Sequence, residues 1–173
     1  MGLYIFDKDG TLIQLKRNRL GLGRPVKHPD EQLVIPGVRA YLDELRASGH
    51  LIAIASNMRA ISQGLMTMED AERMMKDCAD KLGGVNSWRI CPFNASAPGW
   101  IHGKRNPYQQ DNDCHKPKPG MLFALMDELG VSAADTVMVG DSWRDRRAAQ
   151  AAGVKFVPAR SFFGEEWAHH RVI

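Results

Sequence analysis

The chain has few cysteines, no long apolar run and no strong excess of charge of one sign. Cys78, Cys91 and Cys114 are too few, and odd in number, for a disulfide framework, which leaves free thiols or a metal site open. No apolar stretch reaches the roughly 20 residues of a membrane span, and the N-terminal apolar run stops at Asp7, too early for a signal peptide. A net charge of +3 does not by itself indicate a nucleic-acid partner. We therefore expect a cytoplasmic protein with no membrane partner.

The composition is that of an ordinary globular protein. Hydrophobic residues make up 44% of the sequence and charged residues 25%, and no internal repeat or low-complexity segment interrupts it. A length of 173 residues allows one core of substantial size and leaves no room for two domains of ordinary size. We expect a single domain over residues 1–173.

Short β-like apolar runs alternate with longer helix-like segments along the chain. Strands are predicted at residues 3–6, 51–56, 88–91, 136–140 and 154–159. Helices are predicted between them, at residues 36–50, 68–84, 120–130 and 142–153. This alternation is typical of an α/β fold with a mainly parallel central sheet, which binds its ligands at the carboxyl ends of the strands.

Two segments do not follow this alternation. Residues 15–35 are basic and rich in glycine and proline, which predicts a loop or hairpin after the first strand. Residues 92–115 are long for a connection in a small domain, as functional loops often are. The basic residues of the first loop either attract an anionic substrate or form a solvated surface. They are Arg17, Arg19, Arg24 and Lys27.

Polar side chains at the ends of the predicted elements form a candidate site. Asp7 and Asp9 follow the first strand, Ser56 ends the second, Lys116 precedes a helix, and Asp141 and Asp145 follow the strand at 136–140. Because the carboxyl ends of parallel strands meet at one edge of the sheet, these carboxylates should converge with a hydroxyl and an ammonium group. Carboxylates brought so close need a cation, and oxygen ligands suit Mg²⁺ better than zinc or copper. We expect Asp7, Asp9 and Asp141 to hold the metal.

Four segments of the chain resemble the motifs of the haloacid dehalogenase-like (HAD) superfamily, in the same order and each at the end of the matching element. These segments are Asp7-Lys8-Asp9-Gly10-Thr11, Ser56-Asn57, Lys116-Pro117, and Gly140-Asp141-Ser142 with Asp145. The resemblance implies a phosphatase with a Rossmann-like three-layer sandwich. It also implies that Asp7 attacks phosphorus and forms an aspartyl-phosphate. Asp9 would protonate the leaving oxygen and then activate water.

The chemistry of the first motif agrees with these roles. Alternation along an extended chain places Asp7 and Asp9 on one side and Lys8 on the other, so one carboxylate can attack while the other transfers protons. Gly10 permits a tight turn beside the phosphate, and Thr11 offers a hydroxyl.

The later motifs supply groups that bind charge. Ser56 and its neighbouring backbone amide can bind phosphoryl oxygens, and Lys116 can neutralise the charge that develops on them. Asp145 would support the magnesium site or Lys116. Asn57 and Arg59 follow the second strand, where Arg59 can reach a phosphate or carboxylate of the substrate. We therefore assign Lys116 to catalysis, and Gly10, Thr11, Ser56, Asn57 and Arg59 to substrate binding.

The length leaves little room for the large cap domain of many HAD members. The chain resembles the minimal branch of histidinol-phosphate and heptose-bisphosphate phosphatases, through residues 34–57, "VIPGVRAYLDELRASGHLIAIASN", and 115–121, "HKPKPGM". This resemblance implies hydrolysis of a small phosphorylated metabolite such as a sugar phosphate. The phosphatase part of polynucleotide kinase-phosphatases is also similar, so a polynucleotide or nucleotide 3′-phosphate is the alternative substrate. A binding module that has lost its activity is the second alternative, although every motif residue is present.

Relatives in this branch usually bind zinc in the long loop through Cys-x-His and Cys-x-Cys. Residues 91–93 and 112–114 read Cys-Pro-Phe and Asn-Asp-Cys here, so two of the four ligands are absent. The sequence therefore disfavours zinc, because a zinc site takes four good donors. The alternative ligand set is Cys91 and Cys114 with His102 or His115. Without a metal, Phe93, Trp100, Ile101 and Tyr108 are expected to fill the interior of the loop.

Overall fold

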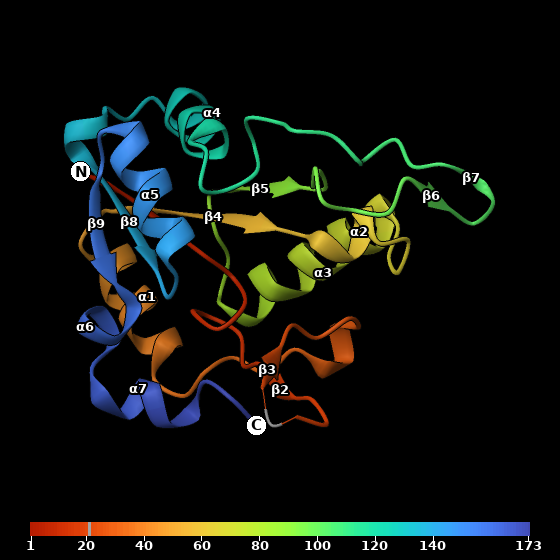
Figure 1. Cartoon of the computed structure of the whole chain (residues 1–173). Helices are drawn as coiled ribbons and strands as arrows, with labels where there is room; N and C mark the ends of the chain where they lie inside the picture. Colours follow the sequence, from red (N-terminus) through yellow and green to blue (C-terminus); the bar gives the residue numbers. More distant parts are fainter. Residues whose placement is uncertain (21) are drawn as a thin grey trace.

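A parallel sheet of five strands forms the centre of the computed structural model, which describes residues 1–20 and 22–173 (Figure 1). The strands lie in the order β5-β4-β1-β8-β9, and every neighbouring pair is parallel. Their bounds are β1 Leu3–Phe6, β4 Leu51–Asn57, β5 Ser87–Cys91, β8 Thr136–Gly140 and β9 Lys155–Pro158. The predicted parallel sheet is confirmed, and each predicted strand lies within two residues of its observed bounds.

Helices cover both faces of this sheet. One face packs against α4 and α5, and the other against α1, α3, α6 and α7 (Figure 1). The long helices are α1 Val38–Ala47, α3 Met68–Lys81, α4 Gly120–Leu129 and α5 Trp143–Ala152. The short ones are α2 Arg59–Ser62, α6 Ala159–Phe163 and α7 Glu165–His170, with 3₁₀ turns at Pro29–Glu31 and Ala133–Asp135. This is the expected three-layer α/β sandwich.

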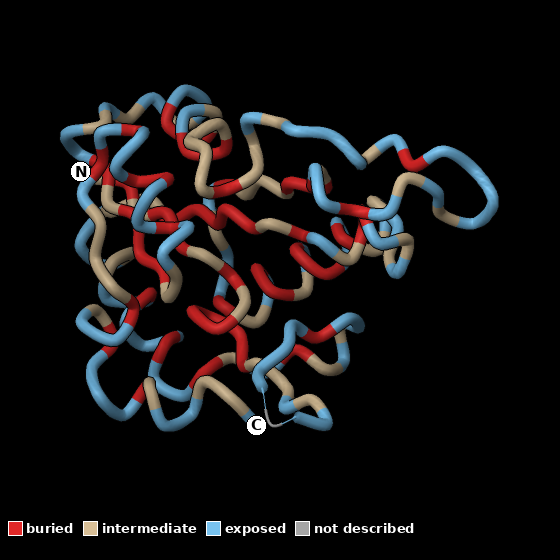
Figure 2. The backbone as a smooth tube through the Cα atoms, viewed as in Figure 1, coloured by how far each residue is buried: buried red, intermediate tan, exposed pale blue. Residues whose placement is uncertain are grey.

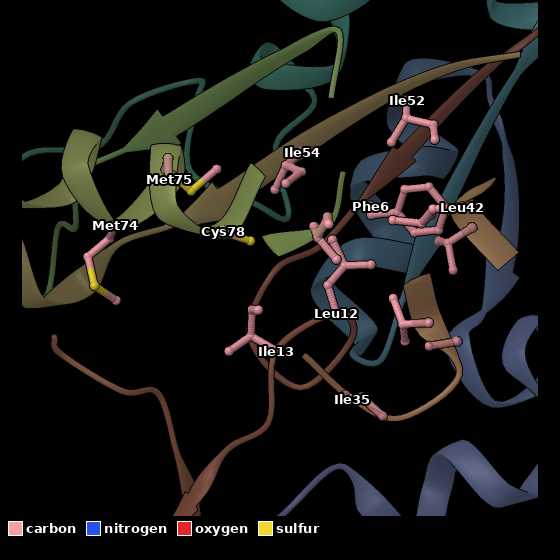
Figure 3. Close-up of a cluster of buried hydrophobic side chains, with 14 of the residues drawn as sticks. Phe6, Leu12, Ile13, Ile35, Leu42, Ile52, Ile54, Met74, Met75 and Cys78 are labelled. Atoms are coloured by element: carbon pink, nitrogen blue, oxygen red, sulfur yellow. The ribbon is translucent and has the colours of Figure 1, made fainter. Parts of the chain in front are cut away.

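The two faces of the sheet carry different sets of buried side chains because successive residues of a strand point to opposite sides. Leu3 and Ile5 of β1 pack in the cluster under α4 and α5, whereas Phe6 packs with Ile54 and Leu42 in the cluster on the opposite face (Figure 3). Burial on both faces explains why the central strands read as continuous apolar runs. Figure 2 shows the buried residues concentrated along these strands.

Side-chain caps mark the start of two of the long helices. Ser142 Oγ accepts a hydrogen bond from the backbone N–H of Asp145, and the Ser142 N–H donates to the Asp145 carboxylate in return; Thr67 and Asp70 form the same capping box at the start of α3. Gly153, in the left-handed conformation, ends α5. Helices α1 and α4 have no side-chain cap, so their prediction rests on the spacing of their apolar residues.

The connections differ more from the prediction. The basic first loop forms a short hairpin of β2 Lys16–Arg17 and β3 Gly23–Arg24, and the second long loop carries another, β6 Trp100–Ile101 with β7 Lys104–Arg105. This second loop projects from the body of the molecule (Figure 1). Its predicted aromatic filling is only partly present, because Phe93 contacts Tyr108 but the Trp100 side chain is 69% exposed.

The C-terminal segment lies against the loop that follows β1. Leu15 pairs with Val172, and the backbone of residues 171–173 exchanges hydrogen bonds with that of residues 15–17. Trp167 of α7 donates a hydrogen bond from its indole nitrogen to the backbone oxygen of Thr11 at 2.9 Å. The C-terminal segment therefore lies against residues 11–17, which follow β1. None of the helices in the described part of the chain has the length and apolar character needed to pass through a lipid bilayer.

Candidate active site

Asp7 lies at the carboxyl end of β1, in the centre of the sheet. Its backbone N–H donates to the carbonyl of Val139 at 3.0 Å, which continues the pairing of β1 with β8 by one residue. Its carboxylate faces Lys116, whose Nζ donates to Asp7 Oδ1 at 2.7 Å. The first and third motifs, 109 residues apart, thus meet through an ion pair.

Lys116 is the buried cation of the site. Its Nζ donates to Asp7 Oδ1, to Asp145 Oδ1 at 2.7 Å and to the carbonyl of Ala55 at 2.8 Å, which uses all three of its protons. Burial alone would lower the pKa of Lys116, but the two carboxylates outweigh it and raise that pKa above its ordinary value. Lys116 is therefore a fixed positive charge beside Asp7.

Asp145 joins the start of α5 to this lysine. Its Oδ2 accepts hydrogen bonds from the backbone and hydroxyl of Ser142 at 3.1 and 2.6 Å, while its Oδ1 accepts from Lys116. Although its burial acts to raise the pKa of Asp145, Lys116 and Ser142 hold it below the ordinary value. A side chain on Gly140 would lie 2.5 Å from the Asp145 Cβ, so only glycine fits there. The Asp145 carboxylate therefore both caps α5 and holds Lys116.

Three carboxylates form the cluster most suited to a metal among the described residues. Oxygens of Asp7, Asp141 and Asp145 lie within 4.8 Å of one another. Oxygen-only donors of this kind fit Mg²⁺. Both oxygens of Asp145 accept short hydrogen bonds, whereas Asp7 Oδ2 accepts only a long one, so Asp7 and Asp141 are the freer ligands. Asp141 also pairs with the guanidinium of Arg171.

Burial and neighbouring charge change the acidity of the cluster. Burial raises the pKa of Asp7 to about 7, with contributions from the charges of Asp145 and Asp141 and against the opposing effect of Lys116. Burial also raises the pKa of Asp141, although Arg171 opposes the shift. The site holds more negative charge than its one lysine compensates, which is the condition under which a divalent cation binds.

The carboxylate of Asp9 is not part of the three-carboxylate cluster. It accepts a hydrogen bond from Lys8 Nζ at 2.6 Å, and the Lys8 side chain is 1% exposed. Asp9 nonetheless lines the same cavity as Asp7 and Lys116. The sequence assigned Asp9 to the metal, and the structure places its side chain beside a lysine instead.

Gly10 and Thr11 shape the loop below Asp7. Gly10 has a φ of 84°, and a side chain there would come within 2.8 Å of Asp141 Oδ2, so both the turn and the close approach require glycine. Thr11 is fully buried and its hydroxyl is 3.4 Å from Asp7 Oδ2, a long hydrogen bond. Its hydroxyl faces the nucleophile candidate.

Residues after β4 form one wall of the site. Ser56 and Arg59 line a cavity of about 170 Å³ that also contacts Asp7, Lys116 and Asp141. The side chain of Asn57 binds the backbone of Lys116 twice, donating to its carbonyl at 2.9 Å and accepting from its N–H at 3.0 Å. Asn57 therefore fixes the backbone of Lys116, a role that the sequence did not reveal.

A second cavity of about 350 Å³ adjoins the first and shares Asp9 and Arg59 with it. Arg24 and Lys27 of the basic loop line it, whereas Arg17 and Arg19 contact neither cavity. Of the four basic residues of this loop, only Arg24 and Lys27 are therefore placed to contact an anionic substrate in these cavities.

The cysteines of the second loop form a disulfide, which the sequence did not predict. Cys91 and Cys114 are joined with their Cα atoms 5.4 Å apart, so neither is one of the free thiols that the sequence left open. His115 Nδ1 bonds the carbonyl of Phe93, and His102 Nε2 bonds that of Gly64. Bonded to each other, the cysteines offer no thiolate for the zinc ligand set considered from the sequence.

Sequence reasoning missed Arg171 and Trp167. Both contact the site from the C-terminal segment, where Arg171 reaches Asp141 and Trp167 binds the backbone of Thr11. Neither lies in a motif or at a strand end, so the sequence carried no signal for their position.

A buried lysine and clustered carboxylates at the carboxyl edge of a parallel sheet are typical of α/β enzymes that transfer phosphoryl groups. The model of the haloacid dehalogenase-like hydrolase family matches residues 22–153, and the chain belongs to this family. It is a phosphatase of the branch without a large cap, as its relatives show.

Two curated relatives carry the name D-glycero-beta-D-manno-heptose-1,7-bisphosphate 7-phosphatase. The protein of Pasteurella multocida is 30% identical over 86% of this chain and 76% of its own length. That of Pseudomonas putida is 30% identical over 95% of this chain and 86% of its own length. A similar solved structure is the D,D-heptose 1,7-bisphosphate phosphatase of B. bronchiseptica with magnesium and phosphate. It has a TM-score of 0.70 and 28% identity, over 91% of this chain and 79% of that one.

Proposed function

We propose that this phosphatase hydrolyses a small phosphorylated metabolite, a sugar phosphate, through an aspartyl-phosphate on Asp7 and with Mg²⁺. One observation carries the proposal: Lys116 Nζ holds Asp7 Oδ1 at 2.7 Å on the wall of a cavity of about 170 Å³. An anionic phosphate approaching there meets a fixed ammonium group and a carboxylate at one point.

In the first step, the free electron pair of an Asp7 oxygen attacks phosphorus, and the bond from phosphorus to the ester oxygen breaks. Asp9, on the wall of the same cavity, gives its proton to the departing oxygen. Lys116 and the hydroxyl of Ser56 face the phosphoryl oxygens, where negative charge accumulates.

In the second step, water attacks the phosphorus of the aspartyl-phosphate. Asp9, now ionised, accepts a proton from that water, the bond between phosphorus and the Asp7 oxygen breaks, and inorganic phosphate leaves. Both carboxyl groups return to their starting states, so the cycle balances.

The donor set of Asp7 and Asp141 fits Mg²⁺ because both side chains present oxygens in the three-carboxylate cluster. The bound ion would neutralise charge between the attacking carboxylate and the phosphate. Asp145 would not bind the ion directly, because its two oxygens accept hydrogen bonds from Lys116 and Ser142; it would act by holding Lys116 in place.

The adjoining cavity of about 350 Å³ would take the leaving group. Arg24, Lys27 and Arg59 line it together with Met58 and Met74, so an anionic group carried by the sugar would meet cations there. The name shared by the relatives, a heptose 1,7-bisphosphate phosphatase, supports a sugar bisphosphate as the substrate.

Phosphate release from a panel of esters tests the proposal. Purified protein with Mg²⁺ is assayed against sugar monophosphates, sugar bisphosphates including heptose 1,7-bisphosphate, and an oligonucleotide with a 3′-phosphate. We expect the highest kcat/KM for a sugar bisphosphate, and loss of turnover in Asp7→Asn and after chelation of the metal. Preference for the oligonucleotide would favour the alternative substrate, and no release from any ester would contradict phosphatase activity. Metal analysis of the same preparation tests for zinc.

A further inference from the structure

Lys8 is a buried cation that the proposed mechanism does not use. Its side chain is 1% exposed, and its Nζ donates to Asp9 Oδ1 at 2.6 Å and to Gln32 Oε1 at 3.1 Å. A buried charge is tolerated only when it is paired and hydrogen-bonded, so both acceptors are needed to hold it.

The far end of this contact is fixed by α3. Gln32 is 1% exposed, and its Nε2 donates to the carbonyl of Met74 at 2.9 Å and to Asp77 Oδ2 at 2.7 Å. Lys81 pairs with the same oxygen of Asp77 at 2.7 Å and donates to the carbonyl of Gln32 at 3.1 Å. Lys8 therefore stands between Asp9 and a hydrogen-bonded support on the helix.

Asp9 lies on the boundary between two cavities. It lines the smaller one with Asp7 and Lys116, and the larger one with Arg24 and Lys8. An acid that protonates the leaving oxygen has to stand at this boundary, because the bond that breaks joins the phosphoryl group on one side to the leaving group on the other.

We propose that Lys8 is the positioning residue of Asp9, holding its carboxyl group at the boundary through a hydrogen bond from Nζ to Oδ1. The inference rests on the proposed function of Asp9 as the acid. It gives Lys8 a role in the first chemical step although Lys8 does not line the smaller cavity, where Asp7 and Lys116 lie.

The charge on Lys8 persists in this environment. Burial acts to lower the pKa of Lys8, but the charge and hydrogen bond of the Asp9 carboxylate outweigh it, and this pKa lies above its ordinary value. An uncharged side chain of similar length would fill the space without the hydrogen bond. Lys8→Met is therefore the informative change.

The leaving group reports on the acid. The alcohol of an alkyl phosphate needs a proton on its oxygen in order to depart. The nitrophenolate of a nitrophenyl phosphate is a stable anion and departs without one. Because kcat/KM covers the steps up to departure, its ratio between the two esters measures how well Asp9 delivers the proton. For Asp9→Asn we expect a loss of about 100-fold or more on the alkyl ester and a much smaller loss on the aryl ester.

Lys8→Met should change the same ratio. We expect kcat/KM to fall about 10- to 100-fold for the alkyl ester and less than about 3-fold for the aryl ester, part of the effect of losing the acid. In the double variant with Asp9→Asn the loss should be no larger than in Asp9→Asn alone, since a positioning residue has nothing left to position. Lys76→Met, on the exposed face of α3, is the matched control.

A second variant covers the case in which Lys8→Met does not fold. Gln32→Met removes the other acceptor of Lys8 and should change the ratio in the same direction by a smaller factor. Equal losses on both esters, or additive losses in the double variant, would overturn the role of Lys8. Absence of a leaving-group effect in Asp9→Asn itself would instead remove Asp9 as the acid, and with it the basis of the inference.

Discussion

At the scale of single residues, the site concentrates negative charge on partly buried side chains. Asp7, Asp141 and Asp145 share one lysine inside the site, and Arg171 compensates Asp141 from its edge. Such an arrangement is unfavourable without a cation, because the carboxylates repel each other and are partly removed from water. The carboxylate cluster therefore lowers the stability of the folded protein as long as no cation is bound.

Asp7→Asn should stabilise the metal-free protein at alkaline pH. The pKa of Asp7 is about 7 in the fold and 3.8 without its surroundings, so the folded state holds the proton more tightly. The stability associated with this group is complete below pH 4 and is lost as the pH rises to about 7. An asparagine avoids that loss, which we expect to be about 1 to 4 kcal/mol.

Urea unfolding with a chelator, at pH 5 and pH 8.5, checks this expectation. The advantage of Asp7→Asn should be larger at pH 8.5, and Mg²⁺ should raise the stability of the wild type more than that of the variant. An advantage independent of pH would contradict the raised pKa.

The sequence was most informative for residues that directly follow a strand. Asp7 and Asp141 could be placed together because the direction of parallel strands fixes where their ends lie. The contact of Lys8 with Asp9 and that of Asn57 with the Lys116 backbone were not predictable. The first depends on a side-chain direction in the loop after β1 and the second on one at the end of β4, where no regular period applies.

At the scale of elements, the C-terminal helix α7 supports the loop that follows β1. The Trp167 side chain is buried, and its indole N–H is the hydrogen-bond partner of the Thr11 carbonyl. Thr11 in turn places its hydroxyl near Asp7. A helix of six residues at the end of the chain thus determines the position of a loop at its beginning.

Trp167→Phe should weaken this support. The smaller phenyl ring leaves part of the space empty, and the buried carbonyl of Thr11 loses its donor; the lost hydrogen bond alone costs about 1 to 3 kcal/mol in the free energy of unfolding. Turnover should fall with it because the loop below Asp7 is less fixed. Denaturant unfolding and phosphate release measure the two effects.

Trp88→Phe is the matched control for this change. Trp88 donates from its indole nitrogen to Glu72 at 2.9 Å, but at an exposed position, so water can replace the bond. We expect a change below about 0.5 kcal/mol. Equal costs in the two variants would show that burial of the Thr11 carbonyl is not the reason.

The four long helices and the five sheet strands were predicted from periodicity, caps and apolar runs. Helices α6 and α7 were missed because they have five and six residues and are separated only by Gly164, too short for a helical period to show. The two hairpins were missed or left open for the same reason, since their strands have two residues each.

At the scale of the whole molecule, the long loop between β5 and α4 is held to the body of the protein at more than one point. It is tied at its two ends by the disulfide of Cys91 and Cys114, and Asn106 binds the carbonyls of Ser62 and Pro98 across it. The hydrogen bond from Asn106 to Ser62 brings the loop to the end of α2, the short helix that begins at Arg59.

Thiol counting checks this arrangement. The native protein should show no rapid reaction with a thiol reagent, because Cys78 is buried and burial raises its pKa to about 12. Unfolding without reductant should expose one thiol, and unfolding after reduction three. Three thiols without reduction would contradict the disulfide.

The position of Lys116 depends on the first turn of α5 because Asp145 belongs to both. The same side chain closes the first turn of α5 and anchors Lys116, so opening of that single turn releases the lysine from one of its two carboxylates. Local openings of this kind need far less free energy than unfolding of the sheet. On warming, the enzyme should therefore lose the alignment of its lysine while its core is still intact.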